Sequence, residues 1–161
     1  MKDETLQSRP GLIVVTGPTA TGKTSFAANL AYRVNGEVIS ADSRQVYRGM
    51  NLATGKDYND YMVEGHRVPC HLIDIADAGY EYSVYDFQKD FLKAFRDIDE
   101  MGKNVVLCGG TGLYIEAVLK GYRLLNVPEN KELRDSLHAR TDQELEAMLR
   151  SFKKPHNVTD F

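Results

Sequence analysis

One short stretch, Gly17-Pro-Thr-Ala-Thr-Gly-Lys-Thr24, constrains this chain most, because it has the spacing G-x-x-x-x-G-K-T. An apolar run, Leu12-Ile-Val-Val15, precedes it. Apolar residues at helical spacing follow it, at Phe26, Ala27, Leu30 and Val34. A strand, a glycine-rich loop and a helix in this order form the context in which the spacing marks a phosphate-binding loop. The sequence therefore predicts a site for a diphosphate or a triphosphate.

Positions of this loop have separate physical roles in binding an anion. Gly17 and Gly22 allow the backbone to turn, so that its N–H groups approach the anion closely. The helix that begins at the loop adds the partial positive charge of its N-terminus. Lys23 adds a full charge, and the hydroxyl of Thr24 is a ligand that Mg²⁺ accepts, so Mg²⁺ is the expected cofactor. The predicted diphosphate- or nucleotide-binding residues are Gly17, Pro18, Thr19, Ala20, Thr21, Gly22, Lys23 and Thr24.

Composition limits the classes of protein that the chain can belong to. Its 161 residues suffice for one α/β domain, and 42% hydrophobic with 27% charged residues is typical of a soluble globular protein. A formal charge of −3 gives no global signal for nucleic acid, although a local basic patch stays open. Cys70 and Cys108 lack metal-ligand spacing and predict reduced core thiols of a cytoplasmic protein. We see no signal peptide and no run long enough to cross a membrane.

Hydrophobic periodicity predicts alternating strands and helices over residues 11–121. We expect strands at about 11–16, 37–41, 71–75 and 104–108, and helices at about 23–34, 84–101 and 113–120. The glycine-, aspartate- and tyrosine-rich region 49–68 has little periodicity and is interpreted as a functional loop. This alternation predicts an α/β fold: a three-layer P-loop NTPase-like core with a parallel sheet and right-handed crossovers.

The two ends of the chain differ in character from this core. Residues 1–10 are polar and charged, and we interpret them as a disordered lead-in. Residues 122–161 predict two short helices, at about 130–139 and 142–152. Thr141 and Glu144 have the spacing of a capping box for the second helix.

A polar segment, Asp42-Ser-Arg-Gln45, follows the second predicted strand. Open α/β sheets bind ligands outside the carboxyl ends of their strands, so this segment should lie beside the phosphate loop. A nucleoside triphosphate hydrolase would instead need an apolar strand ending in an aspartate for magnesium. The strand at 104–108 ends in cysteine and glycine, and Asp74 is only a weak candidate for that aspartate. The pattern favours transfer of a group to a bound acceptor molecule over hydrolysis, in which water attacks.

Four motifs together resemble those of a known family. They are Gly17–Thr24, Ile39-Ser-Ala-Asp-Ser-Arg-Gln-Val-Tyr-Arg-Gly-Met50, Thr54-Gly-Lys56 and Gly109-Gly-Thr-Gly-Leu-Tyr114. Over about residues 11–134, in this order, the chain resembles the tRNA dimethylallyltransferases, also called tRNA isopentenyltransferases. The resemblance is looser over residues 51–78, where a tyrosine-rich connection replaces the acidic or alanine-rich one of the family.

The resemblance implies transfer of a dimethylallyl group from dimethylallyl diphosphate to the exocyclic amine of an adenine next to the tRNA anticodon. It implies a base at Asp42 and a contact from Thr19 to the bridging oxygen of the diphosphate. The amine is a poor nucleophile, so a base that takes its proton fits the chemistry. The implied tRNA contacts are Asp42, Ser43, Arg44, Gln45, Thr111 and, less directly matched, Arg134.

Each of these residues has a plainer interpretation. Asp42 could cap a short helix with Gln45, Thr111 could belong to a tight turn, and Arg134 could be a solvated helix charge. Two other functions also stay open: a small-molecule kinase of the same fold, and a non-catalytic nucleotide-binding fragment.

The resemblance also describes what the chain lacks. Family members continue beyond this length. Their additional part carries an arginine that assists the diphosphate, the later strands of the sheet and most of a helical tRNA-binding insertion. The resemblance thus implies an N-terminal part of the fold: a core at 11–121 and the beginning of the insertion at 122–161. For the full-length form we expect a cytoplasmic monomer.

Overall fold

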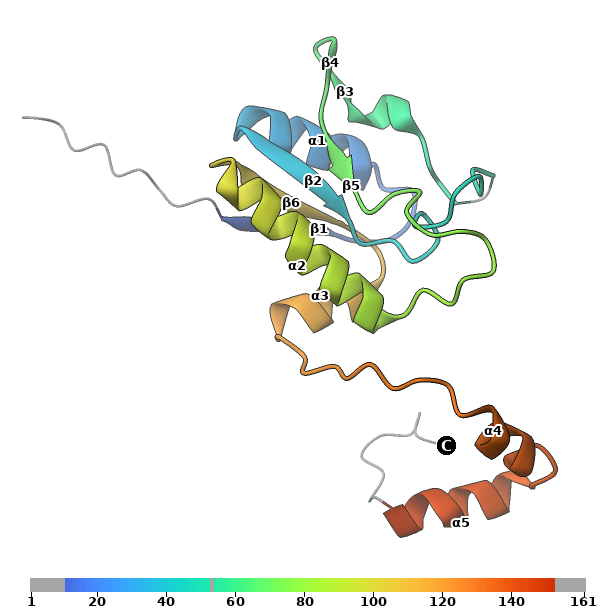
Figure 1. Cartoon of the computed structure of the whole chain (residues 1–161). Coiled ribbons are helices and arrows are strands. Elements are labelled where there is room, and N and C mark those ends of the chain that lie inside the picture. Colours follow the sequence, from blue (N-terminus) through green and yellow to red (C-terminus); the bar gives the residue numbers. More distant parts are fainter. Residues whose placement is uncertain (1–10, 53, 153–161) are drawn as a thin grey trace, which may run out of the picture. The chain divides into compact units, whose positions relative to one another are not determined.

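A computed structural model describes residues 11–52 and 54–152 of the chain. The predicted lead-in at 1–10 lies outside the described residues. The chain divides into two compact units, Met1–Leu124 and Leu125–Phe161 (Figure 1).

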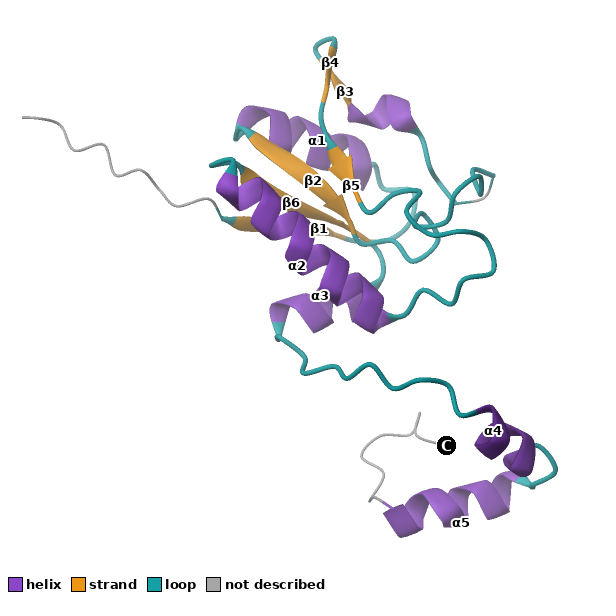
Figure 2. Ribbon diagram, in the orientation of Figure 1, coloured by secondary structure: helices purple, strands orange, loops and turns teal. Residues whose placement is uncertain are grey.

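Four parallel strands form the central sheet of the first unit. They are β1 (Leu12–Thr16), β2 (Gly36–Ser40), β5 (Cys70–His71) and β6 (Asn104–Gly109), in the order β1-β6-β2-β5 (Figure 2). In the register, Leu107 of β6 lies opposite Val14 on one side and Ile39 on the other. β6 is therefore central, which explains its continuous apolar run. The predicted parallel sheet is confirmed.

Helices cover both faces of this sheet, so the predicted three-layer α/β fold is confirmed. α1 (Lys23–Arg33) covers one face through Ala27, Ala28 and Ala31, which are completely buried. Phe26 was expected on this apolar side but is 62% exposed. On the other face, α2 (Val84–Glu100) and α3 (Gly112–Leu119) share one core, in which the rings of Phe87 and Tyr114 stack 4.2 Å apart.

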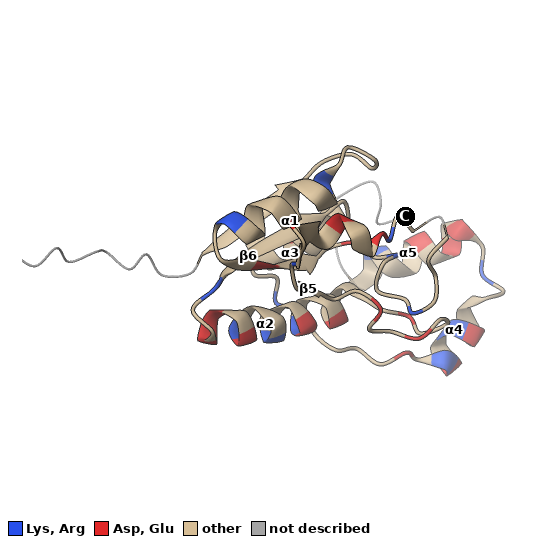
Figure 3. Ribbon diagram, turned by 90° about the horizontal axis from the view of Figure 1, so that it is seen from above, with Lys and Arg blue, Asp and Glu red and all other residues tan. Residues whose placement is uncertain are grey.

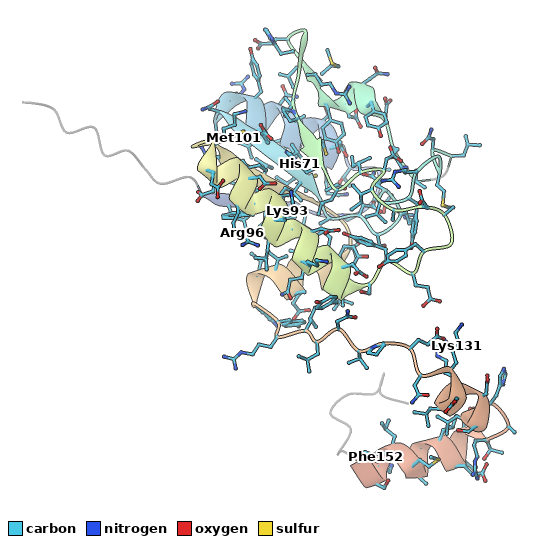
Figure 4. The ribbon with its side chains drawn as sticks, in the orientation of Figure 1. His71, Lys93, Arg96, Met101, Lys131 and Phe152 are labelled. Atoms are coloured by element: carbon cyan, nitrogen blue, oxygen red, sulfur yellow. The ribbon has the colours of Figure 1, made fainter. Side chains whose placement is uncertain are left out.

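Local signals determine where these helices begin and end. Asn35 takes the left-handed conformation at φ 50° just after α1, which ends the helix as its sequence indicates. Ser83 and Asp86 form a capping box at the start of α2. Charged residues occur along α2 (Figure 3), and Lys93 on this helix is 75% exposed (Figure 4).

The interpretation of residues 49–68 as a loop is partly wrong. The segment contains a 3₁₀ helix, η1 (Tyr58–Tyr61), followed by the antiparallel pair β3 (Met62–Val63) and β4 (His66–Arg67). Tyr61 and Val63 are buried in the core beneath α1. Elements of two to four residues are too short to show a hydrophobic period, which is why the sequence pattern missed them.

The predicted strand at 71–75 is wrong beyond His71. Leu72 and Asp74 adopt left-handed backbone conformations, at φ 62° and 55°, which end regular pairing. The N–H groups of Ile75 and Ala76 instead both donate to the carbonyl of Val46, at 2.8 and 2.9 Å. The segment after β5 therefore lies beside the residues that follow β2.

The second unit contains α4 (Lys131–Leu137) and α5 (Asp142–Phe152). Both helices lie where the sequence predicts them. The capping box is confirmed, because Thr141 N donates to Glu144 at 2.9 Å and Glu144 N donates to Thr141 Oγ1 at 3.4 Å. Among the described helices, none combines the length and apolar character that crossing a membrane requires.

Candidate active site

The phosphate-loop motif lies between the carboxyl end of β1 and the N-terminus of α1. Ala20 and Gly22 take left-handed conformations, at φ 61° and 77°, and Gly22 occupies the N-cap position of α1. No side chain among the described residues caps this terminus, and the first turn carries no acidic residue. The first N–H groups of an eleven-residue helix are therefore available to an anion.

Lys23 folds back across this loop. Its Nζ donates to the carbonyl oxygen of Pro18, which also accepts a hydrogen bond from Thr21 Oγ1 at 2.9 Å. The ammonium group is thus held over the loop by a neutral carbonyl. A phosphate oxygen would be a stronger, charge-assisted partner for the same donor.

An open cavity of about 320 Å³ lies next to the loop and brings most of the predicted site residues together. The predicted residues that line it are Thr19, Ala20, Thr21, Gly22, Lys23, Thr24, Asp42, Arg44, Gln45 and Thr111. Gly17, Pro18 and Ser43 are not among the lining residues, although each lies within two positions of one in sequence. A phosphate loop and a carboxylate therefore share one cavity, as the parallel topology requires.

Asp42 begins a turn directly after β2 and Ala41. Its Oδ1 accepts the backbone N–H of Arg44 at 2.9 Å, with the Arg44 guanidinium Nε at 3.7 Å, and its side chain is 20% exposed. The capping interpretation is half right: this bond resembles a cap, but residues 42–46 form a turn and not a helix. Within the described residues no partner is recorded for Oδ2, so that oxygen can accept a proton from a ligand.

The turn after β6 is packed tightly against the end of β2. A side chain at Gly109 would place its Cβ 2.2 Å from the carbonyl oxygen of Ala41, so only glycine fits. Thr111 N donates to the same carbonyl at 3.1 Å, and Thr111 Oγ1 accepts the N–H of Ser43 at 3.0 Å. Thr111 is therefore both part of a turn and a link to the segment that begins with Asp42.

Gln45 uses its side chain inside the protein. Its Oε1 accepts from Ser40 Oγ at 3.2 Å, and its Nε2 lies 3.3 Å from the carbonyl oxygens of both Thr54 and Gly55. The residue is 8% exposed although it contributes to the cavity lining. The geometry gives Gln45 a role in holding the cavity wall.

Eight further lining residues were not among the predicted site residues: Ser40, Thr54, Gly55, Asp60, Tyr61, Cys108, Gly109 and Gly110. Asp60 lies in η1, and burial together with the nearby charge of Asp57 raises the pKa of its carboxyl group. Only the fold brings Asp60 to the phosphate loop, since no motif marks it. Burial raises the pKa of the Cys108 thiol to about 11, so this cysteine stays protonated at neutral pH and is a poor nucleophile.

Two candidate residues are used elsewhere. Asp74, the weak candidate for an aspartate that holds magnesium, instead lies 2.6 Å from Lys56 Nζ and is not among the lining residues. Arg134 lies on α4 in the second unit, 3.5 Å from Glu129, and its contact with tRNA stays a prediction. Among the described residues, no group of three or more His, Cys, Asp or Glu side chains is arranged to hold a metal.

In this sheet a G-x-x-x-x-G-K-T loop follows β1 and an acid follows β2, two strands away. The arrangement defines a P-loop α/β protein with a carboxylate in the cavity beside the loop. The profile of one family, described as IPP transferase, matches residues 45–159. The chain belongs to this IPP transferase family.

Curated relatives and solved structures agree with this assignment. The chain is 60% identical to tRNA dimethylallyltransferase 2 of Bacteroides fragilis over 92% of its own length and 49% of the relative. It is 57% identical to tRNA dimethylallyltransferase 1 of Parabacteroides distasonis, over 92% of its own length and 48% of the relative. The chain spans about half the length of the curated relatives it matches.

Solved structures resemble the chain in three dimensions. The full-length tRNA isopentenylpyrophosphate transferase of Bacillus halodurans matches with a TM-score of 0.66 and 38% identity, over 91% of this chain and 48% of that one. A eukaryotic dimethylallyltransferase acting on tRNA matches with a TM-score of 0.62 and 29% identity, over 85% of this chain and 31% of that one.

Proposed function

We propose that this chain provides the diphosphate site and the base for transfer of a dimethylallyl group to tRNA. The donor is dimethylallyl diphosphate, and the acceptor is the exocyclic amine of an adenine next to the anticodon. The observation that carries the proposal is that the phosphate loop and Asp42 line one cavity. The names of the relatives, which are tRNA dimethylallyltransferases, support the same reaction.

The diphosphate of the donor would occupy the loop at the N-terminus of α1. Backbone N–H groups and Lys23 would stabilise the negative charge that develops on the departing oxygens. Lys23 would exchange its bond to Pro18 for one to phosphate, and Thr19 would contact the bridging oxygen. The oxygen donors of the cavity, Thr24 and Asp60, suit Mg²⁺. When bound there with the diphosphate, Mg²⁺ supplies further charge neutralisation of the leaving group.

The acceptor amine would lie between Asp42 and the allylic carbon. A bond forms from the amine nitrogen to that carbon while the carbon–oxygen bond to the diphosphate breaks. The amine proton passes to the carboxylate of Asp42 through its unengaged oxygen. Ser43 and Thr111, which hold each other, would orient the nucleotide beside the base.

A small-molecule kinase would need arginines that close over a transferred phosphoryl group. In the second unit, Arg134, Arg140 and Arg150 pair with Glu129, Glu144 and Glu146. Exposed pairs of this kind are weak and do not decide between the two functions, whereas the names of the relatives favour the prenyl transferase. We infer that the reaction takes place in the cytoplasm and that the protein at the length of its relatives is a monomer.

Separate calorimetric titrations of dimethylallyl diphosphate and ATP, each with Mg²⁺, test the proposal on this chain. We expect the prenyl donor to bind through its diphosphate and ATP to bind more weakly. A preference for ATP would favour the kinase. Transfer of a radiolabelled prenyl group to tRNA, by the protein at the length of its relatives, then separates the enzyme from a non-catalytic binding module.

A further inference from the structure

An ion pair between a buried lysine and a partly exposed aspartate lies beside the acceptor segment and has no assigned role. Lys56 belongs to the Thr54-Gly-Lys motif, and its side chain is only 2% exposed. Its Nζ lies 2.6 Å from Asp74 Oδ1 and 2.5 Å from the carbonyl oxygen of Tyr47. The other oxygen of Asp74 accepts a hydrogen bond from the hydroxyl of Tyr58. Both oxygens of Asp74 are thus engaged.

This pair joins three segments that are distant in sequence. Asp74, held at φ 55°, donates its backbone N–H to the carbonyl of Gln45 at 3.1 Å. Lys56 binds the carbonyl of Tyr47, and Gln45 binds the carbonyls of Thr54 and Gly55 in return. The backbone after β2 is therefore fixed from both sides, over residues 45–47.

The fixed segment continues directly into the acid of the site. The backbone N–H of Gln45 donates to the carbonyl oxygen of Asp42 at 3.2 Å, which closes the turn. Any shift of Gln45 would therefore change where Asp42 points. Lys56 and Asp74 are absent from the lining of the cavity, so they would act through this turn and not on a ligand.

Fold stability alone gives a poor account of such a pair. Removing the Lys56 ammonium from water is costly, and apolar or neutral replacements of such a pair are often neutral or stabilising. Left-handed conformations at non-glycine residues also cost free energy, and they cluster at functional sites. Leu72 and Asp74 both show this strain beside the pair.

We propose that Lys56 and Asp74 are positioning residues that hold the Asp42–Gln45 turn in the geometry needed by the acceptor adenosine. They do not contact substrate, and the inference rests on the proposed function. Loss of the pair should therefore weaken use of tRNA and leave the diphosphate site intact.

The double variant Lys56→Met/Asp74→Asn separates positioning from stability, because it removes both charges and leaves neither unpaired. At the length of the relatives, we expect its kcat/KM for tRNA to fall at least about tenfold. Its KM for dimethylallyl diphosphate should stay within about twofold, because the loop is unchanged. Parental kcat/KM for tRNA in the double variant would overturn the proposal.

A matched control is available at the opposite end of β2. Glu37 forms a second buried ionic group with Lys103, at 2.7 Å, and His71, at 2.6 Å. We expect the double variant Glu37→Gln/Lys103→Met to change thermal stability but not kcat/KM for tRNA. An equal loss of kcat/KM for tRNA in both double variants would assign the effect to general destabilisation and would overturn the positioning role of Lys56 and Asp74.

Hydrogen exchange on this chain tests the pair even if the proposed function fails. In Lys56→Met/Asp74→Asn, the amides of Ile75 and Arg48 should exchange at least about tenfold faster, while those of α1 keep their protection. Unchanged exchange would overturn the inference. A parental protein that transfers no prenyl group would instead count against the proposed function.

Discussion

The hydroxyl oxygen of Thr111 lies 3.0 Å from the backbone nitrogen of Ser43 and 3.3 Å from its side-chain oxygen, although 68 residues separate the two in sequence. This contact joins the turn after β6 to the turn after β2. It places the two expected acceptor-binding segments in one rigid unit, next to Asp42.

Thr111→Val should uncouple these turns without changing their volume. We expect prenyl transfer to fall by about two- to tenfold, because one net hydrogen bond contributes about 0.5–1.5 kcal/mol. Affinity for inorganic pyrophosphate should not change. Steady-state transfer kinetics check the first expectation, and Thr111→Ser, which keeps the hydroxyl, should recover most of the rate. Equal rates in Val and Ser variants would count against the coupling.

Lys23→Ala should weaken the anion site directly. The variant removes a charge-assisted hydrogen bond, worth about 1.5–3 kcal/mol, so affinity for inorganic pyrophosphate should fall by roughly tenfold or more. Calorimetry on this chain measures the change. Lys93→Ala on the exposed side of α2 (Figure 4) removes the same charge and should bind as the parent does. An unchanged affinity for Lys23→Ala would place the anion elsewhere.

Asp42→Asn should damage chemistry more than binding. The amide oxygen of asparagine can still accept the N–H of Arg44, so the turn should persist while the base is lost. At the length of the relatives, we expect single-turnover transfer to fall by about 10²-fold or more, with little change in tRNA affinity. A normal single-turnover rate would return Asp42 to a purely structural role.

Stability should depend on pH through Glu37. Burial alone would raise the pKa of its carboxyl group, but hydrogen bonds from Lys103 and His71 outweigh burial and lower the pKa below its ordinary value. The folded state then binds fewer protons than the unfolded chain. The contribution of Glu37 to the free energy of unfolding is fully present above the carboxyl pKa of the unfolded chain, about 4.3. It is lost as the pH falls through the lower pKa of the folded state.

Urea unfolding between about pH 3 and pH 6 measures this dependence. Glu37→Gln should flatten the rise of unfolding free energy with pH in that range. An equally steep rise in the variant would assign the dependence to other carboxylates, such as Asp86 beside Ser83. Burial would raise the pKa of Asp86, but hydrogen bonds from Ser83 outweigh it and lower that pKa.

The sequence predicted the core of this fold because its signals are local. The apolar runs of β1 and β6, the period of α2 and the loop motif each lie within a few consecutive turns or strand residues. Asp42 could be expected near the loop because parallel strands bring their carboxyl ends to one edge of a sheet. The expected reaction, prenyl transfer to tRNA, came from the resemblance to the tRNA dimethylallyltransferases and not from the local signals.

The unpredicted parts depend on contacts between distant segments. Asp60 reaches the cavity only because η1 and the β3–β4 hairpin pack on α1, and no period marks elements so short. The left-handed backbone at Asp74 replaces a predicted strand, because Asp74 bonds to Gln45 and Lys56 instead of continuing the pairing of β5. Pairing between residues 18 positions apart leaves no local pattern.

The close approach of Gly109 to Ala41 bears on how a mutational scan of this fold should be interpreted. Gly109 has no side chain to offer to any reaction, yet every replacement would push the carbonyl of Ala41 away and move Asp42 and Thr111 with it. A scan scored by growth or activity would rank this glycine with the reacting groups. Intolerance to substitution at Gly109 would instead reflect the lack of space for a side chain beside the Ala41 carbonyl.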